Sequence, residues 1–204
     1  MIKLSNITLV CIDCVNHASA MKAIYKSIEY IEFGAVKFLT DKLLLSDKFE
    51  TIIIDKITSK EQYSSFIMKY LIDYVQTDFV LIIQYDGYVI HPELWKDYFL
   101  NFDYIGAPWW YDDNYNVGNG GFSLRSKRLL ISIDEILNTV YSGEIHPEDH
   151  IICRILKDYL KNDYGVKFAP DEIAKLFSYE PNPKAGEFKK NTFGFHGIPS
   201  LILK

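Results

Sequence analysis

The chain has 204 residues, of which 49% are hydrophobic and 24% charged, and its formal net charge is −5. These values are typical of one globular domain or two closely fused halves, and the negative charge argues against a nucleic-acid surface. No apolar run reaches the roughly 18 residues of a membrane helix. The N-terminus lacks a signal-peptide pattern, so we expect a cytoplasmic protein. Cys11 and Cys14 are spaced as C-x-x-C, but a redox or zinc role would need a second pair or a thioredoxin context, so we expect the three cysteines to be reduced structural thiols.

In the first half of the chain, short apolar runs alternate with segments of helical periodicity. Strands are predicted at residues 7–12, 36–39, 51–54 and 80–83, and helices at 18–33 and from a Ser59 cap to Tyr74, with Gly34 ending the first helix. This alternation predicts a mostly parallel sheet with right-handed crossovers.

The second half predicts a less regular series of elements. Helices are expected at residues 92–100, 127–140, 147–161 and 171–177, and strands at 103–105, 121–124 and 166–168. A polar, mobile loop is expected at 111–118. The buried stripe of the 147–161 helix is predicted as Ile151, Ile152, Ile155, Leu156 and Tyr159.

The apolar run at residues 80–83 leads into polar side chains. Gln84 and Asp86 are two residues apart, so an extended backbone points both to one side. Ligands of open α/β sheets bind at the carboxyl ends of strands, which makes Asp86 a candidate ligand-binding residue. Capping the turn at Gly87 is the structural alternative for Asp86. A dinucleotide or P-loop enzyme is disfavoured, since neither glycine motif occurs.

Two further motifs follow Asp86. Residues 103–109 read Asp-Tyr-Ile-Gly-Ala-Pro-Trp, and residues 118–125 read Gly-Asn-Gly-Gly-Phe-Ser-Leu-Arg. Together with Gln84 to Asp86 and the Glu148-Asp149 pair, they resemble a family of small, poorly characterised glycosyltransferase-like proteins. The resemblance covers roughly residues 5 to 197 and is most specific in its middle third.

The resemblance implies a GT-A-like α/β fold in a single domain, with a mostly parallel sheet flanked by helices. Residues 1–90 would form the nucleotide-binding half and residues 91–204 a smaller acceptor and catalytic half. It also implies transfer of a sugar from a UDP- or GDP-sugar donor to a glycan or glycoprotein acceptor.

A divalent cation, Mn²⁺ or Mg²⁺, is the implied cofactor, because it would neutralise the departing diphosphate. Asp86 and the near-C-terminal His196 match the expected metal ligands. Gln84 stands where the family's usual motif has a second acid, which weakens the expected metal affinity. Packing against the backbone is the alternative for His196. The expected donor-binding residues are Asp13, Asp41, Asp55, Gln84, Tyr85, Asp86 and Arg125.

Asp149 matches the general base of inverting GT-A enzymes, with Glu148 as the reserve candidate. As acids at a helix start, both also complement the helix dipole, which would lower their pKa. His146 and His150 bracket them, but the order of these residues fits no zinc motif.

The expected sugar- and acceptor-binding residues are Trp109, Trp110, Gly118, Asn119, Gly120 and Gly121. Aromatic rings stack on sugars, Asn119 offers both donor and acceptor groups, and glycines let a backbone approach a ligand. A hairpin-like turn is the alternative for the glycine run. Arg125 would pair either with a phosphate or with a structural acid such as Asp103.

Two other classes of function stay open from the sequence. One is a non-catalytic glycan- or nucleotide-binding module, and the other is a metal-dependent hydrolase of phosphate or sugar esters.

Overall fold

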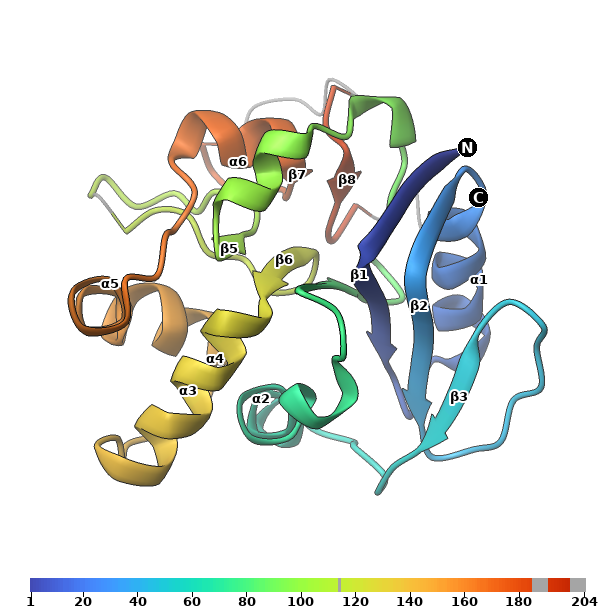
Figure 1. Cartoon of the computed structure of the whole chain (residues 1–204), viewed down its shortest axis with the longest axis horizontal. Helices are drawn as coiled ribbons and strands as arrows, with labels where there is room; N and C mark the ends of the chain where they lie inside the picture. Colours follow the sequence, from blue (N-terminus) through green and yellow to red (C-terminus); the bar gives the residue numbers. More distant parts are fainter. Residues whose placement is uncertain (114, 185–190, 199–204) are drawn as a thin grey trace.

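The computed structural model describes residues 1–113, 115–184 and 191–198. Its main feature is a six-stranded sheet in the order β3-β2-β1-β4-β6-β5 (Figure 1). The strands are β1 (Ile2–Ile12), β2 (Ile31–Thr40), β3 (Glu50–Ile53), β4 (Phe79–Ile83), β5 (Tyr104–Ile105) and β6 (Ser123–Ser126). The first four are mutually parallel, and β6 is antiparallel to both β4 and β5. A small parallel pair, β7 (Ser178–Tyr179) and β8 (Gly194–Phe195), lies over one end.

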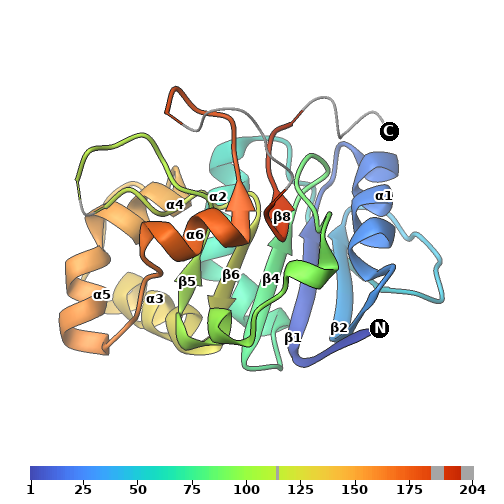
Figure 2. The same ribbon diagram turned by 90° about the horizontal axis from the view of Figure 1, so that it is seen from above.

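Helices cover both faces of this sheet (Figures 1 and 2). The α-helices are α1 (His17–Ile28), α2 (Lys60–Lys69), α3 (Lys127–Thr139), α4 (Glu148–His150), α5 (Lys157–Tyr164) and α6 (Asp171–Phe177). Short 3₁₀ helices are η1 (Leu71–Tyr74), η2 (Pro92–Leu94) and η3 (Asp97–Asn101), and η4 (Ile151–Ile155) is a π-helix.

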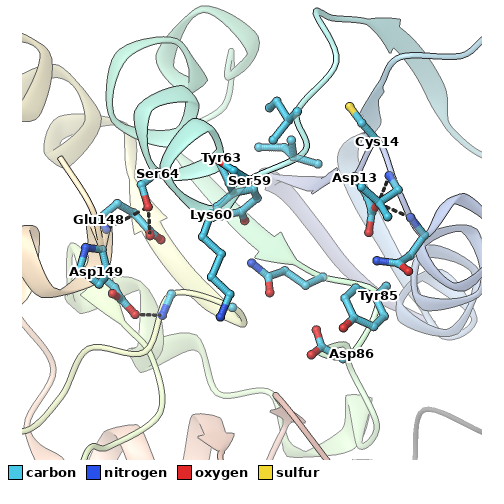
Figure 3. Close-up of a pocket in the computed structure, with 18 of the residues that line it drawn as sticks. Asp13, Cys14, Ser59, Lys60, Tyr63, Ser64, Tyr85, Asp86, Glu148 and Asp149 are labelled. Carbon is cyan, nitrogen blue, oxygen red and sulfur yellow. Dashed lines mark hydrogen bonds between the residues drawn. The ribbon is translucent and has the colours of Figure 1, made fainter.

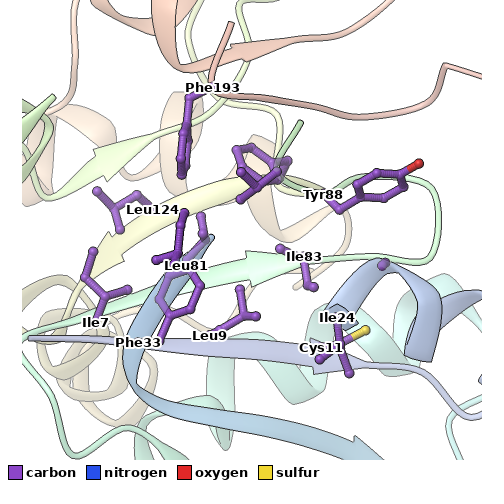
Figure 4. Close-up of a cluster of buried hydrophobic side chains, with 14 of the residues drawn as sticks. Ile7, Leu9, Cys11, Ile24, Phe33, Leu81, Ile83, Tyr88, Leu124 and Phe193 are labelled. Atoms are coloured by element: carbon purple, nitrogen blue, oxygen red, sulfur yellow. The ribbon is translucent and has the colours of Figure 1, made fainter. Parts of the chain in front are cut away.

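The central strands are buried on both faces, which is why they read as continuous apolar runs. Successive β1 side chains point to opposite sides: Leu9 and Cys11 pack with α1 in one core cluster, part of which Figure 4 shows. Val10 and Ile12 join a second cluster with residues of α2 and η1. The expected α/β fold with a mostly parallel sheet is confirmed, and its four parallel strands occur where the sequence predicts them.

The predicted 18–33 helix is too long. α1 ends at Ile28, and β2 begins at Ile31. Gly34 is therefore a strand residue and not a helix stop. A Cβ at Gly34 would lie 2.1 Å from the carbonyl oxygen of Ser5, at the point where the β1–β2 register shifts. The glycine is needed because two backbones approach closely there.

The helix predicted over 92–100 is instead two 3₁₀ turns, η2 and η3. The helix that begins after Ser59 does form, with a capping box between Ser59 and Gln62, but α2 ends at Lys69 and a 3₁₀ turn follows. The strand predicted at 166–168 is reduced to a single bridge between Phe168 and Tyr104. By contrast, α3 and α6 form over nearly the predicted residues.

The predicted 147–161 helix contains a π-helical segment that changes its buried face. The N–H of Leu156 bonds to the carbonyl of Ile151, five residues earlier. This wider turn shifts the register, so Ile155 is 53% exposed, while Cys153 and Leu160 are fully buried. The predicted stripe was therefore wrong at Ile155, and Tyr159 is only half-buried.

All three cysteines are free and buried, as expected for structural thiols. Among the described residues, no helix has both the length and the apolar character that crossing a bilayer requires.

Candidate functional site

A cavity of about 440 Å³ opens at the carboxyl ends of the parallel strands. We call it the first cavity (Figure 3). Its lining comes from the loops after β1, β3 and β4, the start of α2, the turn before β6, the start of α4 and the segment after β8. Of the expected site residues it contains Asp13, Gln84, Tyr85, Asp86, Asn119, Gly120, Gly121, Glu148, Asp149 and His196. Residues far apart in the sequence thus meet where parallel strands end.

Asp86 and His196 lie together on one side of this cavity. Oδ1 of Asp86 is 3.5 Å from Nε2 of His196 and is buried without a hydrogen-bond partner among the described residues. The backbone N–H of Gly197 donates to the carbonyl of Asp86 across 2.9 Å, which fixes the C-terminal segment beside the turn after β4.

Glu180 orients the histidine. Its Oε1 lies 3.1 Å from Nδ1 of His196, and the other ring nitrogen, Nε2, lies 3.1 Å from Oε1 of Gln84. Burial disfavours the imidazolium, yet the hydrogen bond to Glu180 and the charges of Asp86 and Glu180 together raise the pKa of His196.

These residues fit a divalent cation. A metal-binding histidine usually donates one ring N–H to a carboxylate, which orients the other ring nitrogen toward the metal. Here Glu180 is the carboxylate, and Nε2 of His196 faces Asp86. The unpartnered oxygen of Asp86 supplies a second ligand. No group of three or more His, Cys, Asp or Glu side chains suited to a metal occurs in the described parts of the chain. Asp86 and His196 would hold Mg²⁺ or Mn²⁺ together with a substrate's phosphates and water.

Glu148 is occupied by structural contacts. Its Oε1 accepts from Nη2 of Arg125 at 3.1 Å, and its Oε2 accepts from the Ser64 hydroxyl at 3.2 Å. Glu148 is 6% exposed and Arg125 is fully buried, with its guanidinium 5.1 Å from the centre of the Tyr104 ring. The pair is a buried ion pair behind the cavity.

Asp149 is the more available acid. Its Oδ2 accepts from the backbone N–H of Gly120 at 3.0 Å, and its Oδ1 accepts from that of His150 at 2.8 Å. Burial, together with the negative charge of Glu148, raises the pKa of Asp149 to about 6. The expectation that the helix dipole would lower this pKa was wrong, because burial and a neighbouring carboxylate outweigh it.

Side chains of the protein itself occupy the space beside the glycines of residues 118–121. A Cβ at Gly121 would lie 2.2 Å from Nε2 of His196, and one at Gly120 would lie 2.4 Å from Oε1 of Glu148. The ring of Trp109 fills the corresponding space at Gly118. The run therefore lets the site's own residues pack against the backbone, and of its glycines only Gly120 and Gly121 border the first cavity.

Several predicted site residues lie outside the first cavity. Asp41 follows β2 at the same sheet edge but bonds to His17, and Asp55 is exposed. Arg125 pairs with a structural acid, the second of the two alternatives for it, but that acid is Glu148; Asp103 pairs with Arg128. Gly118, Trp109 and Trp110 are also absent from this lining, and Trp110 is 46% exposed.

Other lining residues were not predicted from the sequence: Ser59, Lys60, Tyr63, Ser64 and His146. Lys60 is the first residue of α2 and extends into the space between Asp149 and Asp86 (Figure 3). The capping box at Ser59 was a usable signal, because it places the start of α2 at the ligand-binding edge. Glu180 follows β7 in an irregular segment, and nothing in its local sequence marks it.

Comparison with known families identifies the chain's family. The family model described as "Protein of unknown function (DUF5672)" matches residues 46–196. The chain belongs to this family. No curated protein matches it.

Two solved structures share the fold. The first is a glycosyltransferase involved in the glycosylation of the major capsid of PBCV-1, with 13% identity, a TM-score of 0.59, and coverage of 93% of this chain and 92% of that one. The second is the apo-form glycosyltransferase GlyE of Streptococcus pneumoniae TIGR4, with 12% identity and a TM-score of 0.50. That match covers 95% of this chain but 54% of GlyE, so the chain spans about half its length. Together with the sheet described above, these similarities give the chain a GT-A-like fold.

Proposed function

We propose that this protein is a glycosyltransferase that moves one sugar from a UDP- or GDP-sugar to a glycan hydroxyl with inversion at the anomeric carbon. The observation that carries the proposal is that one cavity, at the ligand-binding edge of a GT-A-like sheet, holds both candidate metal ligands and a candidate general base. Asp86 and His196 form one group, and Asp149, with a pKa raised to about 6, belongs to the other. Both structural neighbours are glycosyltransferases, which supports the same class of activity for this chain.

The donor diphosphate would lie beside Asp86 and His196. A divalent cation held by these two residues would supply charge neutralisation for the leaving diphosphate. Lys60, which lines the cavity, would add a positive charge from the protein. Asp13 and Tyr85 border the same side and would contact the nucleoside.

Asp149 would act as the general base. Its carboxylate takes the proton of the acceptor hydroxyl, and the acceptor oxygen attacks the anomeric carbon from the face opposite the diphosphate. The bond from that carbon to the phosphate oxygen breaks, and the electron pair leaves with the diphosphate. A base whose pKa lies near neutrality is well matched to this task.

A thermal-shift panel of nucleotide sugars with and without Mn²⁺ tests the proposal. A donor present at 100 times its dissociation constant should add about 2.7 kcal/mol of apparent stability. The shift should require Mn²⁺ and should vanish in Asp86→Ala. The matched control is Asp55→Ala, since Asp55 follows β3 at the same edge but is exposed and outside the cavity. The absence of any metal-dependent shift in the wild type would contradict the proposal.

Turnover separates the two alternatives. Donor breakdown at equal rates with and without a glycan acceptor would indicate a hydrolase. Binding without turnover or a metal effect would indicate a non-catalytic module.

A further inference from the structure

A second cavity, of about 450 Å³, lies beside the first. Its described lining comes from the loop after β5, from α6 and β7, and from Glu180, Asn182, Lys184, Asn191 and Thr192. Its volume is within the roughly 300 to 1,000 Å³ of small-molecule sites. The function proposed above does not use it.

The described lining of this cavity has the composition of a carbohydrate site. Three aromatic residues and three amides border it: Trp109, Tyr111, Tyr179, Asn116, Asn182 and Asn191. Aromatic rings present flat apolar faces, which suit the C–H face of a sugar ring. Amides both donate and accept hydrogen bonds, as hydroxyl groups require.

The charged residues of the lining are already paired. Asp171 forms an ion pair with Lys175, Asp112 forms one with Lys184, and Glu180 bonds to His196. In the part of the lining that the structure describes, both lysines are thus paired with an acid, which favours an uncharged, hydroxyl-rich ligand over an anionic one.

The two cavities adjoin at Glu180, and Trp109 of the second lies near the short helix α4 that carries Asp149. Glu180 borders the second cavity while its carboxylate bonds to His196 of the first. The ring of Trp109 lies 6.5 Å from that of His150, the residue after Asp149. A chain of sugars with one hydroxyl near Asp149 would thus have its next residues near Trp109. In addition, the hydroxyl of Ser178 lies buried in the wall without a partner among the described residues.

We propose that the second cavity binds the sugars that adjoin the reacting one, so that the acceptor is an oligosaccharide and not a single sugar. This inference rests on the proposed glycosyl transfer. Trp109 is the stacking platform, and Asn116 and Asn191 contact the hydroxyls, since the amide of Asn182 is bonded within the chain through both its nitrogen and its oxygen.

A glycan microarray carrying defined monosaccharides and the oligosaccharides built from them tests this. Fluorescently labelled full-length protein should be retained on particular oligosaccharides and at least about tenfold less on their terminal monosaccharides. Trp109→Ala should lower this retention about tenfold or more, as expected when a central aromatic contact is truncated. Trp110→Ala is the matched control. The Trp110 ring is next to Trp109 in the sequence, but it is exposed and borders neither cavity.

Three results would overturn the inference: no oligosaccharide is retained, monosaccharides bind equally well, or folded Trp109→Ala binds like Trp110→Ala. If Trp109→Ala does not fold, Asn191→Ala decides, since this amide lines the cavity at an exposed position and its loss leaves the core intact. Its retention should then fall several-fold, and unchanged retention would overturn the inference.

The nucleotide-sugar panel keeps this result separate from the proposed function. If a donor binds but no oligosaccharide does, only the inference about the second cavity is contradicted. If an oligosaccharide binds through Trp109 but no donor binds, the proposed glycosyl transfer is contradicted.

Discussion

The backbone N–H of Gly120 donates to the carboxylate of Asp149 across 3.0 Å, and this bond joins the glycine-rich turn to the start of α4. The neighbouring acid, Glu148, turns to Arg125 and Ser64. Both carboxylates line the cavity, but Glu148 is committed to a buried ion pair, whereas Asp149 has a raised pKa. This difference is why we propose Asp149, and not Glu148, for proton transfer.

Asp149→Asn tests the assignment directly. The amide keeps the size of the side chain and an oxygen that can accept from Gly120, but it cannot take a proton. General-base catalysis typically contributes about 10² to 10⁴ in rate, so kcat should fall by that factor. The dissociation constant of the donor, measured by titration calorimetry, should change little. A variant with nearly normal kcat would exclude Asp149 as the base.

Glu148→Gln should act mainly on stability. Arg125 is fully buried, and replacing its partner leaves an uncompensated charge, which typically costs about 3 to 5 kcal/mol. Urea denaturation should show this loss, while Glu144→Gln, at an exposed position just before the same helix, should be close to neutral. Equal stabilities of the two variants would mean that the Arg125 pair contributes little.

The raised pKa of Asp149 predicts a pH dependence of stability. The ordinary value is 3.8, and the folded protein raises it to about 6, so the folded state holds this proton more tightly than the unfolded state. The resulting penalty is absent below about pH 4, grows between pH 4 and 6, and is complete above that. Asp149→Asn should remove it, raising Tm relative to wild type at pH 7.5 but not at pH 4. A Tm difference that does not vary with pH would contradict the raised value.

Much of the site was predictable because parallel topology brings strand ends together. The alternation and length of the apolar runs were enough to predict β1 and β4. Because both strands are parallel, Asp13 and Asp86 were then expected at the same edge of the sheet. Asp149 and His196 needed the motif resemblance, since no local pattern distinguishes a cavity acid from a helix-start acid.

The remaining errors arose where tertiary contacts override local patterns. Arg125 reads as a phosphate ligand, but its burial against Glu148 depends on a helix that begins 23 residues later. The glycines read as ligand-approach positions, but Trp109, Glu148 and His196 occupy the space that their missing side chains leave. Ile155 was misplaced because a π-helical turn leaves no mark in hydrophobic periodicity.

Lys60 gives the last prediction. It is the lysine of the described cavity lining, and it begins α2, whose N-terminal end also favours negative charge. If the donor diphosphate develops charge as it leaves, Lys60→Met should lower kcat/KM by roughly tenfold or more, in keeping with the loss of one electrostatic contact to a transition state. The variant should still bind Mn²⁺-dependent donors, because Asp86 and His196 are untouched.

Lys60→Arg should restore much of the rate, because it returns the positive charge at the same helix start. Lys56→Met is the matched control: Lys56 is exposed on the preceding loop and lies outside the cavity lining. The loss in Lys60→Met should also shrink at high salt, because screening weakens the wild-type contact that the variant lacks. If Lys60→Met and Lys56→Met have equal rates, the leaving group takes its stabilisation from elsewhere, and the diphosphate does not lie along the start of α2.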